Sequence, residues 1–304
     1  MIDHDPYLIS NCIIAENRKK RPEIDENSLS CPFCLGHEED IEEVRLETKD
    51  EAGNFLIKIV NNKYPICTPL SEPYGIHDVV IDTPNHLEKP KDFLEEHWRV
   101  LLQTMQARWR EMVMDPKIEF IQVFKNYGKA AGASISHSHW QMVALSEIPY
   151  HVALQYEHYN AFYKQDQSCY ICHMLKELPN DLIILQNETW VVVAPKASQF
   201  AHETWLIPRR HSKHFGDLNS EELYTCSLLL KKLLMAYDEL LKSDSAFNIC
   251  FMSGGIKNTI DYHFYIKMIP RINQIAGFEL ATNCYFNTVH PKTHVQLMKN
   301  ILEE

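Results

Sequence analysis

The chain has 304 residues, of which 45% are hydrophobic and 23% are charged, a composition typical of a folded protein large enough for two domains. Its 41 acidic and 30 basic residues give a net charge of -11 at pH 7, which argues against broad binding to nucleic acid or to an anionic membrane. A phosphate-bearing ligand therefore requires a local cluster of donor groups.

The start of the chain, MIDHDPYLIS, has no basic segment followed by an apolar core, so we expect no signal peptide. The most apolar helical stretch, CSLLLKKLLMAYDELL, is interrupted by Lys231 and Lys232, so we expect no membrane span. The nine cysteines are an odd number and follow no export signal, which predicts reduced thiols and a cytoplasmic location. The two Cys-x-x-Cys pairs are then candidate metal ligands.

The first half of the chain opens its pattern with Cys31 and Cys34, followed by two strand-like runs, VNNKYPICTP and HDVVIDTPNH, the second ending at His86. A helix is predicted over PKDFLEEHWRVLLQTMQARWREM, where apolar residues recur at helical spacing. Its predicted apolar face contains Phe93, Leu94, Trp98, Leu101, Leu102, Met105 and Trp109. A strand, a Gly-containing loop and a second strand follow in FIQVFKNYGKAAGASISHSHWQM.

The second half repeats this order after a predicted linking helix, EIPYHVALQYEHYNAFYKQDQ. It contains Cys169 and Cys172, the runs LQNETWVVVAP and HETWLIPRRH, and a helix that opens with a capping-box pattern at Asn219. The run AFNICFMSGGIKNTIDYHFYIKMIP then carries His263, and HPKTHVQLMKNIL predicts a short terminal helix.

The histidine spacing supports a duplication. His137 follows His86 by 51 residues, and His263 follows His211 by 52. The pattern predicts an α+β fold, mainly antiparallel sheet, with one crossover helix per half. We divide the chain into an N-terminal half over residues 1–146, a linking helix over 147–167 and a C-terminal half over 168–304.

The stretch SHSHWQM, residues 136–142, carries the densest set of functional side chains. Alternate residues of a strand point to the same face, so His137, His139 and Gln141 share one face. The residues alone leave three interpretations open: metal ligands, a catalytic group, or hydrogen-bonded strand histidines.

The segment KNYGKAAGASISHSHWQ resembles the active-site segment of the galactose-1-phosphate uridylyltransferase-like family of the histidine-triad superfamily. The runs NRKKRP, CPFCLG, NNKY and TPNH resemble further motifs of that family, in the same order, so the resemblance extends over nearly the whole chain. It implies a duplicated histidine-triad-like fold.

The resemblance implies that His139 is the nucleophile and that Gln141 holds a covalent nucleotidyl-histidine intermediate, which predicts ping-pong kinetics. Gln141 also stands where the hydrolase branches of the superfamily have a third histidine, so transfer is favoured over hydrolysis. The candidate nucleotide- and phosphate-binding residues are Arg18, Arg21, Asn62, Asn126 and Ser134.

The resemblance and the repeat together imply two structural zinc sites. The ligands expected at site 1 are Cys31, Cys34, His86 and His137, and those expected at site 2 are Cys169, Cys172, His211 and His263, with His202 as a competitor for His211. The C-terminal half carries Tyr265 at the position of His139, so we expect it to be catalytically degenerate.

The segment GFELATNCYFNTVHP resembles the ADP-glucose phosphorylase branch, because Tyr285 stands where the uridylyltransferases have a hexose-binding glutamine. Glu279, and more weakly Lys267, are candidate sugar contacts. The implied function is nucleotidyl transfer on nucleoside-diphosphate sugars. The alternatives are ADP-glucose phosphorolysis, nucleotide hydrolysis, or a non-catalytic zinc- or nucleotide-binding protein.

The implied partners are a nucleotide sugar and either a sugar phosphate or inorganic phosphate. The family resemblance also implies a homodimer. We expect neither nucleic acid nor a membrane as a partner.

Overall fold

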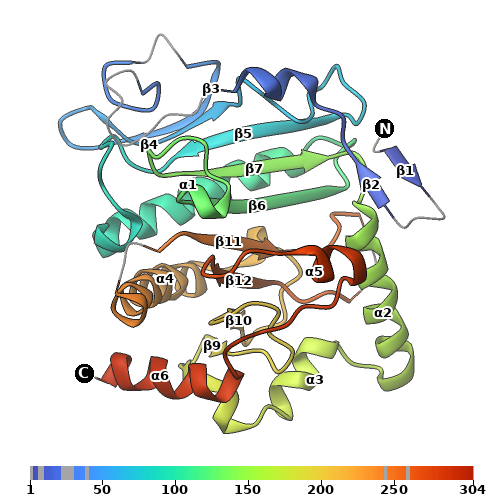
Figure 1. Ribbon diagram of the computed structural model, residues 1–304. Helices are drawn as coiled ribbons and strands as arrows, with labels where there is room; N and C mark the ends of the chain where they lie inside the picture. Colours follow the sequence, from blue (N-terminus) through green and yellow to red (C-terminus); the bar gives the residue numbers. More distant parts are fainter. Residues whose placement is uncertain are drawn as a thin grey trace.

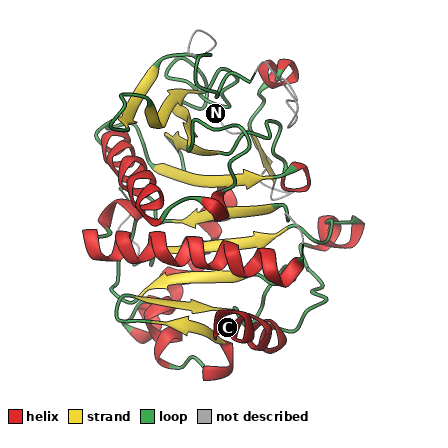
Figure 2. Ribbon diagram, turned by 90° about the vertical axis from the view of Figure 1, so that its left-hand side faces the viewer, coloured by secondary structure: helices red, strands yellow, loops and turns green. Residues whose placement is uncertain are grey.

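The computed structural model describes residues 3–5, 10–21, 31–37, 41–242, 245–257 and 261–303. Its main feature is one ten-stranded antiparallel sheet in the order β3-β4-β5-β7-β6-β11-β12-β10-β9-β8 (Figure 1). Figure 2 shows the strands of both halves stacked into this continuous sheet. A separate two-stranded ribbon pairs β1 (Asp3–Asp5) with β2 (Ser10–Cys12).

The first half of the sheet is built from five strands and one long helix. In chain order these are β3 (Val44–Lys49), β4 (Phe55–Asn61), β5 (Gly75–Ile81), α1 (Glu95–Val113), β6 (Phe120–Tyr127) and β7 (His139–Leu145). Short 3-10 turns lie at η1 (Glu16–Lys20), η3 (Pro90–Asp92) and η4 (Lys129–Ala131). Every residue of β7 is buried, because both faces of the sheet are covered there.

The second half repeats the same plan. Its elements are β8 (Ile183–Gln186), β9 (Trp190–Val193), β10 (Thr204–Pro208), α4 (Ser220–Leu241), β11 (Phe247–Met252) and β12 (Tyr265–Pro270). The strand order 8-9-10-12-11 mirrors 3-4-5-7-6. The predicted duplicated α+β fold is therefore confirmed. We keep the division at 1–146, 147–167 and 168–304 as a proposal.

Further elements connect or cover the halves. These are α2 (Tyr150–Asp166), α3 (Tyr170–Lys176), η5 (Asn180–Leu182), η6 (Phe215–Asp217), α5 (Gly277–Thr282) and α6 (Pro291–Glu303). Helix α2 lies in the predicted linking segment, and α6 in the predicted terminal helix. No helix in the described part of the chain is both long and apolar enough to cross a bilayer.

The halves join where β6 pairs with β11, from Val123–Phe251 to Tyr127–Phe247. The chain leaves β6 through Gly128, whose φ of 80° lies in the left-handed region that favours glycine. A Cβ atom at Gly128 would lie 2.8 Å from Cβ of Ala246, so this position also has no room for a side chain. The two halves are in close contact at this point.

Helices α1, α4 and α6 cover one face of the sheet with a single apolar core, which includes Trp98 and Leu230. The predicted capping box of α4 is confirmed, because the Asn219 side chain accepts from the Glu222 backbone and Glu222 accepts in return. The predicted apolar face of the first helix is wrong at Leu94. The helix begins at Glu95, so Leu94 precedes the first turn, and its side chain is exposed.

The opposite face is covered differently in the two halves. In the second half, α2 and α3 pack an aromatic cluster against it, with Tyr156, Tyr262 and Tyr265 buried. In the first half, Phe33 and Ile41 pack over part of this face, beside Ile81. The candidate site lies on this face of the first half.

Candidate active site and metal centres

Strand β7 begins with His139, which the family resemblance predicts to be a nucleophile. The register pairs His139 with Ile81 and Gln141 with Val79 of β5, which places both side chains opposite the α1 face. Both side chains are buried. The two predicted residues therefore lie on a buried strand that is paired with β5.

The His139 ring has one nitrogen tied to the main chain. Its Nδ1 lies 2.8 Å from the carbonyl oxygen of His137, so Nδ1 carries the proton and donates it. Burial lowers the pKa of His139 to about 4, so the ring is neutral at pH 7. The lone pair on Nε2 is then available as a nucleophile.

His77 on β5 fixes the orientation of the Gln141 side-chain amide. The backbone N–H of Ile66 donates to His77 Nδ1 at 3.1 Å, so the ring proton is on Nε2. That Nε2–H donates to Gln141 Oε1 at 3.0 Å. Burial lowers the pKa of His77 to about 4, which keeps this tautomer neutral. The NH2 group of Gln141 is thereby turned away from His77.

The candidate cations approach from the N-terminal segment. Arg18 Nη1 donates to the carbonyl oxygen of Tyr64 at 2.8 Å, and Arg21 Nε donates to Ser134 Oγ. Burial lowers the pKa of both guanidinium groups, although both remain charged at neutral pH. Burial is the main cause that lowers the pKa of His77, and the charges of Arg18 and Arg21 lower it further.

The two predicted asparagines lie on separate parts of the sheet: Asn62 directly follows β4, and Asn126 lies on β6, with β5 and β7 between these two strands. Asn62 accepts from the Tyr64 backbone N–H at 2.8 Å, and its Nδ2 lies 3.1 Å from His77 Nε2. Asn126 Oδ1 accepts from Asn248 Nδ2 at 2.8 Å, and Asn248 also donates to Ala131 O at 3.0 Å. Asn248, from the second half, therefore fixes the Asn126 amide and the loop after β6.

His77 and Asn248 were not identified from the sequence. Each is a polar residue within a strand, on the same face as the predicted nucleophile, but neither belongs to a spacing pattern. A sheet register is required to assign them to the site.

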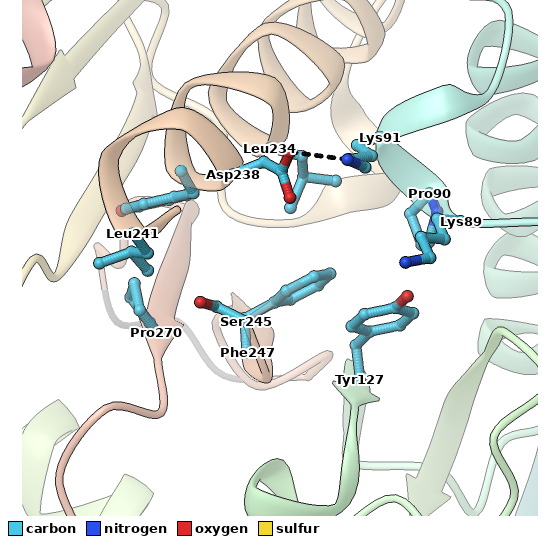
Figure 3. A pocket seen from close by; sticks show the side chains of 11 residues that line it. Lys89, Pro90, Lys91, Tyr127, Leu234, Asp238, Leu241, Ser245, Phe247 and Pro270 are labelled. Carbon is cyan, nitrogen blue, oxygen red and sulfur yellow. Dashed lines mark hydrogen bonds and ion pairs between the residues drawn. The ribbon is translucent and has the colours of Figure 1, made fainter. Parts of the chain in front are cut away.

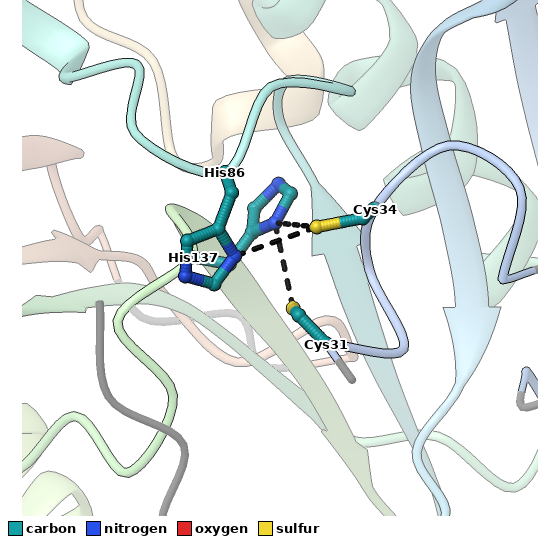
Figure 4. A group of neighbouring side chains, drawn as sticks. All are labelled: Cys31, Cys34, His86 and His137. Atoms are coloured by element: carbon teal, nitrogen blue, oxygen red, sulfur yellow. Dashed lines mark hydrogen bonds between the residues drawn. The ribbon is translucent and has the colours of Figure 1, made fainter. Parts of the chain in front are cut away.

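The four ligands predicted for site 1 converge in the structure (Figure 4). The Nδ1 atom of His137 lies 3.6 Å from the Sγ atoms of both Cys31 and Cys34, and Cys34 Sγ lies 3.4 Å from His86 Nδ1. A tetrahedral zinc ion with bonds of about 2.3 Å to sulfur and about 2.0 Å to nitrogen separates these atoms by about 3.5 Å. The residues therefore fit a zinc ion.

The polar neighbours of site 1 support the same interpretation. His137 Nε2 donates to Thr83 O at 2.8 Å, which leaves Nδ1 unprotonated toward the thiols. Burial raises the pKa of Cys31 to about 12, and a divalent cation favours the thiolate that burial disfavours.

Site 2 has the same construction. Cys172 Sγ lies 3.5 Å from His211 Nδ1 and 3.3 Å from His263 Nδ1, and Cys169 completes the cluster. His263 Nε2 donates to Pro208 O at 2.9 Å. The competitor His202 does not join the cluster. Its Nδ1 lies 3.0 Å from Nδ1 of His294, on the terminal helix α6.

The candidate sugar contacts lie in the second half. Lys267 Nζ lies 3.0 Å from Glu203 Oε1 and donates to Gln199 Oε1 at 3.0 Å. Glu279 is buried, accepts from the backbone N–H of Ala276 at 3.1 Å, and lines a small cavity with Tyr285. The structure does not place either residue beside His139.

A second small cavity lies near the junction of the halves, away from His139 (Figure 3). Its lining includes Lys89, Tyr127 and Phe247, and an ion pair between Lys91 Nζ and Asp238 Oδ2 at 2.6 Å closes one side. The cavity volume is about 30 Å³, enough for roughly two water molecules. It does not accommodate a nucleotide sugar.

Two family models match the chain. "Domain of unknown function (DUF4931) N-terminal domain" matches residues 13–148, and "Domain of unknown function (DUF4921)" matches residues 91–304. The second match covers more than half of the chain.

Two characterised relatives match over most of their length. An ADP-glucose phosphorylase from Arabidopsis thaliana is 30% identical over 291 residues, which cover 90% of this chain and 82% of that protein. A galactose-1-phosphate uridylyltransferase from Thermotoga maritima is 24% identical over 302 residues, which cover 95% of this chain and 94% of that protein.

Solved structures agree with these relatives. The crystal structure of an ADP-glucose phosphorylase from Arabidopsis thaliana with bound ADP-glucose has a TM-score of 0.82 and 29% identity, and the match covers 98% of each chain. A uridylyltransferase structure has a TM-score of 0.86 at 22% identity and covers 99% of this chain and 98% of that chain, which supports the fold.

Proposed function

Because the chain belongs to the family of ADP-glucose phosphorylases and galactose-1-phosphate uridylyltransferases, and to the family described as DUF4921, we propose that it transfers a nucleotidyl group from a nucleoside-diphosphate sugar through His139. The observation that carries the proposal is the buried, neutral His139, whose Nδ1–H is held by the carbonyl oxygen of His137. A neutral imidazole with one fixed proton presents its other nitrogen as a nucleophile.

In the first step, Nε2 of His139 attacks the α-phosphorus of the nucleotide sugar. An N–P bond forms, the P–O bond to the sugar phosphate breaks, and the sugar 1-phosphate leaves with the electron pair. The ring keeps its Nδ1–H and becomes positively charged, and the hydrogen bond to His137 O at 2.8 Å stabilises that charge.

In the second step, an oxygen of a phosphate acceptor attacks the same phosphorus, and the N–P bond breaks with its electron pair returning to Nε2. Gln141 donates from its NH2 group to a non-bridging phosphate oxygen in both steps, since His77 holds its carbonyl oxygen. A glutamine cannot remove a proton from the acceptor. An already ionised phosphate needs no such base, whereas water does, and this favours transfer over hydrolysis.

The remaining polar groups suit the charge of a diphosphate. Arg18 and Arg21 bring two positive charges to the site, and Asn126 has its NH2 group free of the Asn248 hydrogen bond. Asn62 and Ser134 lie beside His77 and Arg21 respectively. We propose that these five residues hold the nucleotide and its phosphates.

We favour ADP-glucose as the donor and inorganic phosphate as the acceptor. The 30% identical relative is an ADP-glucose phosphorylase, and Tyr285 replaces the glutamine that the resemblance associates with hexose binding in uridylyltransferases. UDP-hexose with a hexose 1-phosphate acceptor is the second candidate, supported by the uridylyltransferase relative that covers 95% of the chain. We propose Glu279 and Lys267 as weaker sugar-side contacts.

We propose that both Cys/His clusters bind zinc in a structural role. When bound at site 1, zinc supplies four bonds that fix His137, two residues before the nucleophile. Elemental analysis is expected to find about two zinc ions per chain if both clusters are filled. Other divalent metals in place of zinc would contradict the assignment.

We also propose a homodimer in a reducing, cytoplasmic compartment. The side chains of Phe278, Leu280 and Phe286, on and beside α5, are exposed, which is typical of a contact surface. All nine cysteines are free, which suits a reducing compartment. Light scattering of the purified protein is expected to give twice the chain mass, and a monomer mass would contradict the dimer.

The nucleotidyl intermediate is the direct test of the mechanism. Incubating the protein with ADP-glucose or UDP-glucose and no acceptor is expected to give an acid-labile adduct, whose intact mass identifies AMP or UMP. Adding phosphate is expected to discharge an AMP adduct as ADP, and His139→Asn to prevent its formation. Absence of an adduct with every nucleotide sugar tested would exclude transfer through His139.

A further inference from the structure

Behind His139, on the α1 face of the sheet, lies a group of buried polar side chains. Lys125 Nζ on β6 donates to Asp82 Oδ2 at 2.6 Å and to Ser138 Oγ at 2.7 Å. It also donates to the main-chain oxygen of His139 at 3.1 Å. The side chains of Lys125 and Asp82 are fully buried, and the ammonium lies 5.5 Å from the ring centroid of Trp140.

The sheet opens at this position in the first half only. The ladder between β6 and β7 ends at the Phe124–Gln141 pair, before it reaches His139. The equivalent ladder between β11 and β12 continues past the matching pair, Cys250–Lys267, to Met252–Tyr265. The Lys125 ammonium therefore holds the carbonyl oxygen of His139 at a point where β7 is paired with β5 but has no ladder partner on the β6 side.

The second half has apolar residues at the same positions. The register places Phe251, Phe264 and Pro208 where the first half has Lys125, Ser138 and Asp82. The rings of Phe251 and Phe264 are buried, with centroids 5.7 Å apart. The same fold thus forms without any charge at these positions.

A buried ion pair is costly to form, because both charges lose their hydration. In this pair, Asp82 Oδ1 is buried and has no hydrogen-bond partner among the described residues, so its lost hydration is not replaced by a hydrogen bond. Well-packed apolar residues of similar volume are often at least as stabilising as such a pair. Stability alone therefore does not account for the ion pair being present in the first half and absent in the second.

We propose that Lys125, paired with Asp82 and Ser138, is a positioning residue that holds the backbone of the nucleophile His139 in place of the missing ladder pairs. His139 and the facing Asn126 form no ladder pair between β6 and β7, and the ammonium group holds this stretch of backbone instead. The geometry explains why the network occurs only in the half that carries a nucleophile. The inference rests on the proposed role of His139.

The test is the double variant Lys125→Met/Asp82→Leu, which removes both charges so that neither is left buried alone. We expect it to fold, to keep its metal content and to unfold at a temperature no lower than that of the wild type. Its kcat is expected to fall by about 100-fold, the effect of a nucleophile displaced by about 1 Å, while KM changes by less than about threefold. Burst-phase formation of the nucleotidyl enzyme should slow by the same factor.

Hydrogen exchange gives a readout that does not depend on activity. Backbone amides of residues 138–141 are expected to exchange faster in the double variant, while residues 264–267 of the second half stay unchanged. The matched control is Phe264→Leu, at the position equivalent to Ser138, which is expected to lower the unfolding temperature and leave kcat unchanged.

A folded double variant whose kcat stays within about twofold of the wild type would overturn the proposal. If the wild-type protein forms no nucleotidyl adduct at all, the proposed function fails, and hydrogen exchange decides the positioning role on its own. Unchanged exchange over residues 138–141 would then overturn it.

Discussion

The two halves of the molecule share a strand order and a Cys/His cluster but differ in the side chains that follow the shared histidine. His139 on β7 corresponds to Tyr265 on β12. The hydrogen bond from His77 to Gln141 at 3.0 Å corresponds to the ion pair of Glu203 with Lys267, also at 3.0 Å. The comparison shows that the Cys/His clusters are common to both halves, whereas the proposed nucleophile and its glutamine occur in the first half alone among the described equivalent positions.

The sheet faces that lie opposite helices α1 and α4 also differ between the two halves. Helix α2 covers the second half, where Tyr156 OH donates to Ser253 O at 2.9 Å, and the rings of Tyr159 and Tyr262 lie 4.9 Å apart. Arginine side chains and amides occupy the corresponding face of the first half. An aromatic core fills one copy of the surface, and polar groups line the other.

The largest expected effect separates the two strand positions. His139→Asn removes the nucleophile, so kcat is expected to fall by at least about 10⁴-fold. Tyr265→Phe, at the equivalent position, is expected to keep kcat within about twofold. Steady-state assays of the nucleotide-sugar reaction measure both. A comparable loss in Tyr265→Phe would mean that the second half takes part in the chemistry.

Removing one ligand from each Cys/His cluster tests whether loss of site 1 and loss of site 2 affect kcat differently. Cys34→Ala and Cys172→Ala are each expected to lose about one zinc ion and several kcal/mol of stability. Only Cys34→Ala is expected to reduce kcat of the folded protein, by roughly 10- to 100-fold, because its cluster holds the strand of His139. Metal analysis and kcat per folded molecule measure this. Equal kcat losses would contradict the division.

The His77–Gln141 hydrogen bond and its counterpart give a finer comparison. His77→Phe frees the Gln141 amide to rotate, and kcat is expected to fall by about tenfold, the value of one hydrogen bond of about 1.4 kcal/mol. Glu203→Gln weakens the ion pair with Lys267 and is expected to lower stability without changing kcat. An unchanged kcat in a folded His77→Phe variant would remove His77 from the site.

The smallest expected effect concerns the stability of the protein in acid. It tests a buried histidine that lies outside the candidate site. Burial lowers the pKa of His294 to about 3, so below pH 6.5 the unfolded chain binds a proton that the folded chain does not. As the pH is lowered from 7 to 5.5, this residue therefore lowers the free energy of unfolding by about 1 kcal/mol. Over the same pH interval, urea titrations of His294→Gln should show a loss of unfolding free energy that is smaller by this amount, with kcat unaffected. An identical pH dependence in both proteins would contradict the buried neutral state.

The duplication and the strand face of His139 could be predicted from spacing and alternation in the sequence, and the two ligand clusters from the repeat together with the family resemblance. The continuous sheet could not, since the pairing of β6 with β11 leaves no local pattern in either strand. His77 and Asn248 were missed for the same reason. Lys125 did leave a signal, as a charged residue at the end of the mostly apolar run FIQVFK, but its partner Asp82 is identified only by the fold.

The pairing of β6 with β11 also determines which parts of the chain can be deleted. A fragment ending at residue 146 would leave β6 as an open edge, with its backbone groups from Val123 to Tyr127 unpaired and prone to aggregation. It would also lose the Asn248 side chain that holds Asn126. The half without the proposed nucleophile is therefore needed, because it closes the edge of the half that carries His139.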